Sequence, residues 1–215
     1  MMGQLAMRLI KSDRADTRQG PIDGTDVAFI NSSEDLARRA RSGDEEAFSL
    51  IFDRFIRPIT SFIYEMVGNR SIAEELAQET FVRAYKNLDA LRDDGKLSTW
   101  LYGISRNVIR EWLRLPHEKR SPVEVDDQAV LELQDTQLGP DGQFMNKELI
   151  GVTRRALQLL NEDQRMVFSL RVFRQHSYQE IAEITGFSLT KVKKDLFRAR
   201  ETMRRQLGPY LEVSR

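Results

Sequence analysis

Residues 177–200 read SYQEIAEITGFSLTKVKKDLFRAR, a stretch with the pattern of two short helices joined by a turn. Ser177 with Glu180 three residues later forms a capping box, which starts a helix. Gly186 supplies the turn, because glycine readily adopts the left-handed conformation that ends helices. A short capped helix, a glycine turn and a second helix together predict a helix-turn-helix.

The second of these helices has an apolar face and a basic face. The apolar residues that share a face, and that we expect to be buried, are Val192, Leu196, Ala199, Met203 and Leu207. Over residues 186–207 seven Lys and Arg residues stand against two acids, and Phe197 points outward among the cations. A solvated charged face is the simpler alternative. The turn and the outward ring favour DNA, whose phosphates attract cations and whose thymine methyls suit an apolar side chain.

Asp195 interrupts this basic run, and two roles compete for it. It could pair with Lys191 one turn earlier or with Arg198, or it could accept a hydrogen bond from a cytosine amino group. Its place on the flank of the outer face favours the structural role. In either role its charge opposes nearby phosphates and restrains indiscriminate binding.

Upstream, apolar residues recur at spacings of three and four from residue 33 to Pro116, which predicts four helices. The N-caps that we expect for the first, third and fourth helices are Ser33, Ser71 and Ser98. Pro58 should kink the second helix, which Gly68 and Asn69 end. Downstream, Asn161 with Gln164 starts another helix, and a stripe of Met145, Leu149, Val152, Ala156 and Leu159 forms the helix before it.

These segments predict an all-α fold of two small helical domains joined by a flexible linker, the second domain being the helix-turn-helix. We expect a mobile N-terminal extension over 1–30, a first domain over 31–115, a linker over 116–142, a second domain over 143–208 and a tail over 209–215. Three of the six prolines fall in the linker, and residues 121–150 carry seven acids against one lysine.

Composition excludes several kinds of chemistry. Lys plus Arg and Asp plus Glu both number 33, so any electrostatic attraction must come from how charge is distributed. There is no cysteine and there are two histidines, which argues against disulfides, thiolate chemistry and a metal cofactor. No apolar run is long enough for a membrane span. We expect a cytoplasmic protein with no cofactor and no membrane insertion.

Two blocks of sequence, in this order and separation, narrow the function. Residues 71–114 read SIAEELAQETFVRAYKNLDALRDDGKLSTWLYGISRNVIREWLR, and residues 157–207 run from LQLLNEDQRMVF through the helix-turn-helix to RRQL. Together they resemble the extracytoplasmic-function sigma factors of bacterial RNA polymerase. The resemblance implies a non-enzymatic alternative sigma factor that directs core polymerase to particular promoters, assists strand opening and serves a stress response.

The resemblance also implies partners and contact residues. Region two of the family binds the clamp helices of the largest polymerase subunit and the melted minus-ten element. Region four binds the polymerase flap and the minus-thirty-five duplex, and an anti-sigma factor controls both. The matching polymerase-binding residues are Glu75, Gln78 and Glu79. The matching minus-ten residues are Asp94, Lys96, Ser98, Tyr102, Arg106, Asn107 and Arg110. The matching minus-thirty-five residues are Thr190, Lys193, Lys194, Phe197, Arg198 and Arg200.

The residues themselves support part of this interpretation and leave two rivals. Five Lys and Arg against two acids over 102–120, with Tyr102 and Trp112 among them, suit single-stranded nucleic acid. For Trp100 and Trp112 core packing is the simpler role. Glu75 and Glu79 share a helical face as metal ligands do, which keeps a nucleic-acid enzyme as one alternative. A self-standing helix-turn-helix repressor or activator is the other.

Overall fold

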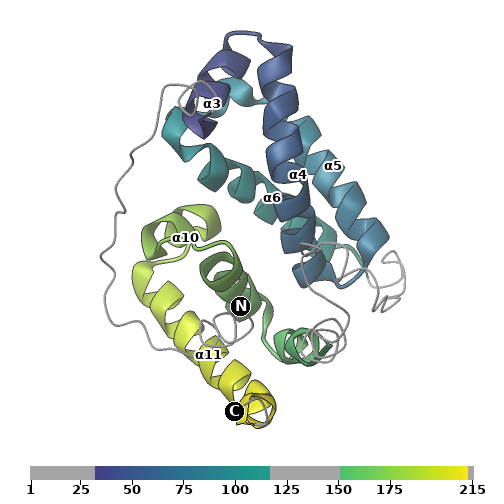
Figure 1. Ribbon diagram of the computed structural model, residues 1–215, viewed down its shortest axis with the longest axis vertical. Helices are drawn as coiled ribbons and strands as arrows, with labels where there is room; N and C mark the ends of the chain where they lie inside the picture. Colours follow the sequence, from purple (N-terminus) through teal and green to yellow (C-terminus); the bar gives the residue numbers. More distant parts are fainter. Residues whose placement is uncertain (1–31, 117–150, 213–215) are drawn as a thin grey trace.

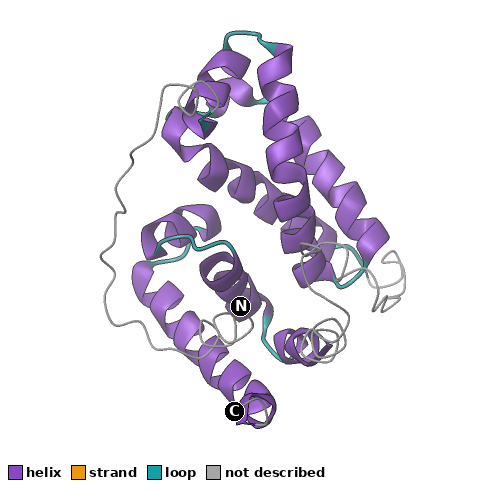
Figure 2. Ribbon diagram, viewed as in Figure 1, coloured by secondary structure: helices purple, strands orange, loops and turns teal. Residues whose placement is uncertain are grey.

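The computed structural model describes residues 32–116 and 151–212 of the 215-residue chain. All regular structure in these ranges is helical, which confirms the all-α prediction (Figure 2). The expected extension over 1–30, nearly all of the linker, Met145, Leu149 and the last three residues lie outside them. We refer to residues 32–116 as the N-terminal region and to residues 151–212 as the C-terminal region.

The N-terminal region contains four α-helices and two short 3-10 turns. In chain order these are α3 (Ser33–Arg41), α4 (Glu45–Val67), α5 (Arg70–Lys86), η1 (Leu88–Ala90), η2 (Asp94–Lys96) and α6 (Leu97–Leu113). In the C-terminal region a helical stretch over 151–158 precedes α9 (Glu162–Phe168), the π-helical segment η4 (Ser169–Phe173), α10 (Tyr178–Thr185) and α11 (Leu189–Glu212).

All three caps expected in the N-terminal region are wrong by one or two residues. Ser32 caps α3, Asn69 caps α5 by accepting from the Ile72 amide at 3.0 Å, and α6 begins after Lys96 with no side-chain cap. Ser71 therefore lies inside α5, because the side-chain oxygen of Asn69 already accepts from the free backbone N–H groups at the start of the helix. Helix α4 continues through Pro58 to Gly68, which ends it in the left-handed conformation.

The caps expected in the C-terminal region are confirmed. Asn161 with Gln164, and Ser177 with Glu180, each form a reciprocal capping box. Gly186 ends α10 with φ of 70°. The expected face of α11 is buried, with Val192, Ala199, Met203 and Leu207 at 0% exposure and Leu196 at 1%. The expectation that Leu159 belongs to the buried stripe is wrong. Leu159 is 62% exposed, because the chain leaves the helix there.

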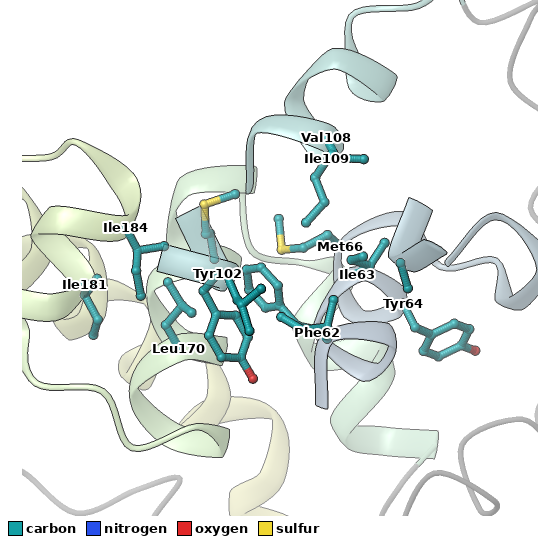
Figure 3. Close-up of a cluster of buried hydrophobic side chains, with 14 of the residues drawn as sticks. Phe62, Ile63, Tyr64, Met66, Tyr102, Val108, Ile109, Leu170, Ile181 and Ile184 are labelled. Carbon is teal, nitrogen blue, oxygen red and sulfur yellow. The ribbon is translucent and has the colours of Figure 1, made fainter. Parts of the chain in front are cut away.

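The two regions pack against each other and share one hydrophobic core. In Figure 1, α10 lies next to α6, and the start of the C-terminal region lies near the end of α4. Figure 3 shows Phe62 and Tyr102 of the N-terminal region beside Leu170 and Ile184 of the C-terminal region. The contact between regions is therefore apolar at its centre, where burial of side chains stabilises it.

We predict opposite effects of alanine at two glycines. Gly186→Ala should lower the free energy of unfolding by about 1–2 kcal/mol, because its φ of 70° is strained for any side chain with a Cβ. Gly103→Ala should raise it by roughly 0.5–1 kcal/mol, because Gly103 is helical and open space surrounds the added Cβ. Urea unfolding followed by circular dichroism measures both. Equal effects in the two variants would contradict the left-handed turn.

Candidate nucleic-acid interface

Helix α11 presents five of its six candidate DNA-binding residues to solvent. Val192, Leu196 and Ala199 hold the helix against the core. The candidates on the other side, all exposed, are Thr190, Lys193, Lys194, Phe197 and Arg198, whereas Arg200 is half-buried. Phe197 is 69% exposed, which confirms its outward direction. An exposed aromatic ring between cations gives this face both apolar contact area and positive charge, as a DNA groove requires.

Asp195 occupies the structural position, not the solvent face. Its side chain is buried, and its Oδ2 accepts from Lys191 Nζ at 2.6 Å. The same ammonium lies 2.8 Å from Asp163 Oδ2 on α9. Lys191 thus bridges two acids, which raises its pKa through the hydrogen bonds to Asp163 and Asp195. The bridge fastens the start of α11 to α9, a role that sequence reasoning anticipated only as one pair.

The seven candidate minus-ten residues follow η2 and α6, and they differ in accessibility. Asp94 accepts from Arg41 Nη1 at 2.7 Å, a contact across 53 residues that no pattern in the sequence indicated. Asn107 is exposed, while Ser98 and Arg110 are half-buried. Tyr102 is 3% exposed and packs edge-on against Phe62 and His176. In this arrangement Tyr102 is a core residue, and its ring is not accessible to a base.

Two cations of this set are already occupied by the C-terminal region. Lys96 Nζ donates to both carboxylate oxygens of Glu183 at 2.9 Å. Arg106 Nη2 donates to the backbone carbonyl of Thr185 at 2.6 Å. Partial burial of Arg106 lowers its pKa, and the neighbouring Arg110 acts in the same direction. The structure therefore brings Lys96, Tyr102 and Arg106 together at the contact between regions.

A buried ion pair beside them was not foreseen from the sequence. Arg174 Nη1 donates to both oxygens of Glu65 at 2.8 Å, and Ser169 Oγ donates to the same carboxylate. The side chains of Glu65 and Arg174 are 15% and 9% exposed. The Arg174 guanidinium also lies 5.5 Å from the Phe62 ring centre. The one signal available was a single acid among the apolar residues of the last turns of α4.

The candidate polymerase-binding residues lie on α5, away from the contact between regions (Figure 1). Glu75 and Gln78 are exposed and Glu79 is half-buried. Glu79 accepts from Arg83 Nε at 2.7 Å. Arg83 also donates from both Nη atoms to the two carboxylate oxygens of Glu111 on α6, which makes a bidentate ion pair. The hydrogen bonds that Arg83 donates to these two acids, the ones to Glu111 first, raise the pKa of Arg83. Glu79 is thus part of an ion-pair chain as well as a surface group.

A metal-dependent site finds no support in the described part of the chain. No group of three or more His, Asp or Glu side chains gathers there in a way that could hold a metal ion. None of the helices across these ranges is long and apolar enough to cross a membrane.

The fold and the exposed basic face define a helical protein with a C-terminal helix-turn-helix. Residues 51–115 match the family described as Sigma-70 region 2, and residues 151–203 match Sigma-70, region 4. The RNA polymerase sigma-H factor of Pseudomonas aeruginosa strain PAO1 is 31% identical over 185 residues, which cover 83% of this chain and 95% of that protein. The ECF RNA polymerase sigma-E factor of Escherichia coli strain K12 is 29% identical over 184 residues, with coverage of 82% and 94%.

The chain therefore belongs to the extracytoplasmic-function (ECF) sigma factors, transcription initiation factors that direct RNA polymerase to promoters. Solved structures share the fold. One is described as CnrH in complex with the cytosolic domain of CnrY, with a TM-score of 0.62 and 23% identity, covering 82% of this chain and 97% of that chain. Another is the sigma factor RpoE with the anti-sigma factor NepR from Bartonella quintana, with a TM-score of 0.59 and 21% identity, covering 75% and 96%.

We predict that His176 makes stability depend on pH. Its ring is 5% exposed, its Nε2 is buried without a partner, and burial lowers its pKa below the ordinary 6.5. The folded protein thus binds fewer protons at this site than the unfolded chain, so stability falls as pH drops through about 6.5. The melting temperature should be several degrees lower at about pH 5.5 than at about pH 7.5.

His176→Gln is the control, because it removes the titration and keeps a polar side chain of similar size. Burial opposes ionisation of Glu180, yet hydrogen bonds from Ser177 lower its pKa below the ordinary 4.5, so it titrates beneath this window. The pH dependence of melting should therefore be much flatter in His176→Gln. An unchanged dependence would assign the effect to other groups.

Proposed function

We propose that this sigma factor reads the minus-thirty-five element with α11. The observation that carries the proposal is the exposed face of Thr190, Lys193, Lys194, Phe197 and Arg198 on a helix whose opposite face is fully buried. The capping box at the start of α10 and the left-handed Gly186 at its end define the turn that leads from α10 into α11. A rigidly held helix can place its side chains in a major groove at defined positions.

The residues of η2 and α6 form the minus-ten surface of the same proposal. Lys96, Arg106 and Arg110 supply positive charge, and Asn107 supplies amide hydrogen bonds. The Tyr102 ring, which His176 covers in this structure, can stack on a base once it is uncovered. Asp94 and Ser98 frame the loop in which a flipped-out base would sit. Their positions along one turn and one helix agree with a continuous path for a single strand.

Polymerase and an anti-sigma factor complete the set of proposed partners. Glu75, Gln78 and Glu79 form an acidic, hydrogen-bonding face on α5 that suits a basic partner surface on the clamp helices. The RpoE structure from Bartonella quintana contains an anti-sigma factor. By analogy with that assembly, control by an anti-sigma factor is proposed here, and the site of action is the cytoplasm, where polymerase is found.

Transcription with core polymerase tests the promoter assignment. A template library with randomised upstream sequence is transcribed with and without the protein, and the selected start sites are sequenced. The protein should enrich one pair of elements. Lys194→Ala should reduce transcription from these promoters about tenfold, since it removes a phosphate or base contact.

Arg205→Ala is the matched control, because Arg205 is an exposed cation on α11 outside the proposed face. It should leave transcription nearly unchanged. If the same promoter sequences were enriched without the protein, the proposed function would be wrong. Tight duplex binding without polymerase would support a repressor or activator, and metal-dependent cleavage of the template would support an enzyme.

For the polymerase contact, we predict that Gln78→Ala combined with Glu79→Lys weakens binding to core polymerase at least about tenfold by reversing charge at a complementary surface. Glu74→Lys is the matched control, because Glu74 is an exposed acid on α5 that pairs with Arg70 four residues away, as Glu79 pairs with Arg83. It should bind normally. Pull-down measures the affinity of each variant for core polymerase. An equal loss of affinity in the double variant and in Glu74→Lys would show a general charge effect instead of a specific contact.

A further inference from the structure

The C-terminal region occupies the surface proposed for the minus-ten element. Lys96 is paired with Glu183, Arg106 with the Thr185 carbonyl, and Tyr102 is covered by His176. These are three of the seven residues assigned to single-stranded DNA. The groups that engage them belong to α10 and the turn before it, and α10 lies next to α6 in Figure 1.

The groups that engage them resemble a nucleic-acid strand in charge. Glu183 presents a carboxylate to Lys96 as a phosphate would. Thr185 is the last residue of α10, so its carbonyl lies at the negative end of that helix. One full negative charge and one partial negative charge thus lie where phosphate oxygens are expected. The His176 ring packs edge-on against Tyr102, so another aromatic ring already covers it.

The same arrangement cannot span a promoter. The two elements are centred about 25 base pairs apart, which is roughly 85 Å along B-form DNA. Thr185 contacts Arg106, and Leu189 at the start of α11 lies only four positions further along the chain. Those residues reach at most about 14 Å, and Thr190 to Arg198 adds about 12 Å of helix. The two proposed reading surfaces therefore lie within about 30 Å of each other and must separate.

The Glu65–Arg174 pair holds this closed arrangement. Its members come from different regions, and both are nearly buried. Loss of one partner leaves an uncompensated charge at low dielectric, which is strongly unfavourable. Because the pair lies between regions, separation of the regions returns the remaining charge to water. The pair can therefore act as a latch.

We propose that the C-terminal region is an internal competitor of the minus-ten strand, and that the Glu65–Arg174 latch sets how often the surface is free. This proposal rests on the minus-ten surface proposed above. Promoter binding then requires opening, and the apparent affinity of the free protein for single-stranded DNA falls in proportion to the small open fraction. Any variant that weakens the latch should bind single strands more tightly.

Opening is measured first, by the distance between two labels. The chain has no cysteine, so Ser49→Cys on α4 and Arg205→Cys on α11, both at exposed positions, accept a fluorophore or spin-label pair specifically. The otherwise wild-type protein should give one narrow distance distribution. Arg174→Glu, which repels Glu65, should give a broad distribution at longer distances. Arg174→Glu with Glu65→Arg restores opposite charges and should return the narrow one.

Binding is measured next, with a fluorescent single-stranded oligonucleotide of random sequence. All proteins carry Lys193→Ala and Lys194→Ala, so that α11 contributes little. Arg174→Glu should tighten binding by roughly tenfold or more, and the charge-swapped double variant should lose the gain. Adding Arg106→Ala to Arg174→Glu should also cancel it, because the freed surface is then damaged. If Arg174→Glu loses its helical circular dichroism, Glu65→Gln replaces it with the same expected directions.

Two results overturn the proposal. Either the distance distribution is the same in all latch variants, or the regions separate without any gain in binding. In the second case, promoter strand opening is measured with the holoenzyme, to tell whether the masking or the assignment of the minus-ten surface is wrong. If Arg106→Ala still impairs opening there, the minus-ten surface stands and only the masking is wrong. If Arg106→Ala has no effect, the assignment of that surface is wrong as well.

Discussion

The Glu65 carboxylate is the point on which the arrangement of the two regions depends. It lies near the end of α4 and receives hydrogen bonds from both Ser169 and Arg174. A charge at this depth is tolerated because the Arg174 guanidinium pairs with it and hydroxyl groups donate to it as well. The hydrophobic contact around Phe62, Tyr102 and Leu170 stabilises the packing of the two regions by burying apolar surface, but this effect is not directional. The ion pair, with the hydrogen bonds that Lys96 and Arg106 donate to α10, supplies directional contacts between the regions.

The separate helices were largely predictable from the sequence, because they follow from local rules. Capping at Asn161 and Ser177, the turn at Gly186 and the buried face of α11 each depend on residues within one or two turns. The caps of α3 and α5 were displaced because another capping residue, Ser32 or Asn69, stands one or two positions earlier and accepts from the free N–H groups, whereas α6 begins without a side-chain cap. The exposed side of α11 was predicted for the same local reason.

The contact between regions was not predictable in this way. Glu65 and Arg174 are 109 residues apart, and Lys96 and Glu183 are 87 apart. No periodicity links such partners, and charged residues are common at solvated positions. The sequence therefore placed Lys96, Tyr102 and Arg106 on the correct helix and turn, but it could not show that another part of the chain already holds them. Tyr102 illustrates the point, because a ring that suits base stacking also suits a core.

The π-helical segment over 169–173 gives these contacts a dependence on chain length. A π-turn contains one more residue per hydrogen-bonded ring than an α-turn, and here it directs both Ser169 and Arg174 toward one carboxylate. Deletion of a single codon in this segment would convert it to a regular helix and rotate everything downstream by about 100°. Arg174 would then leave Glu65, although no chemical group of the pair had been changed. In genetic terms, the segment should tolerate substitution far better than deletion.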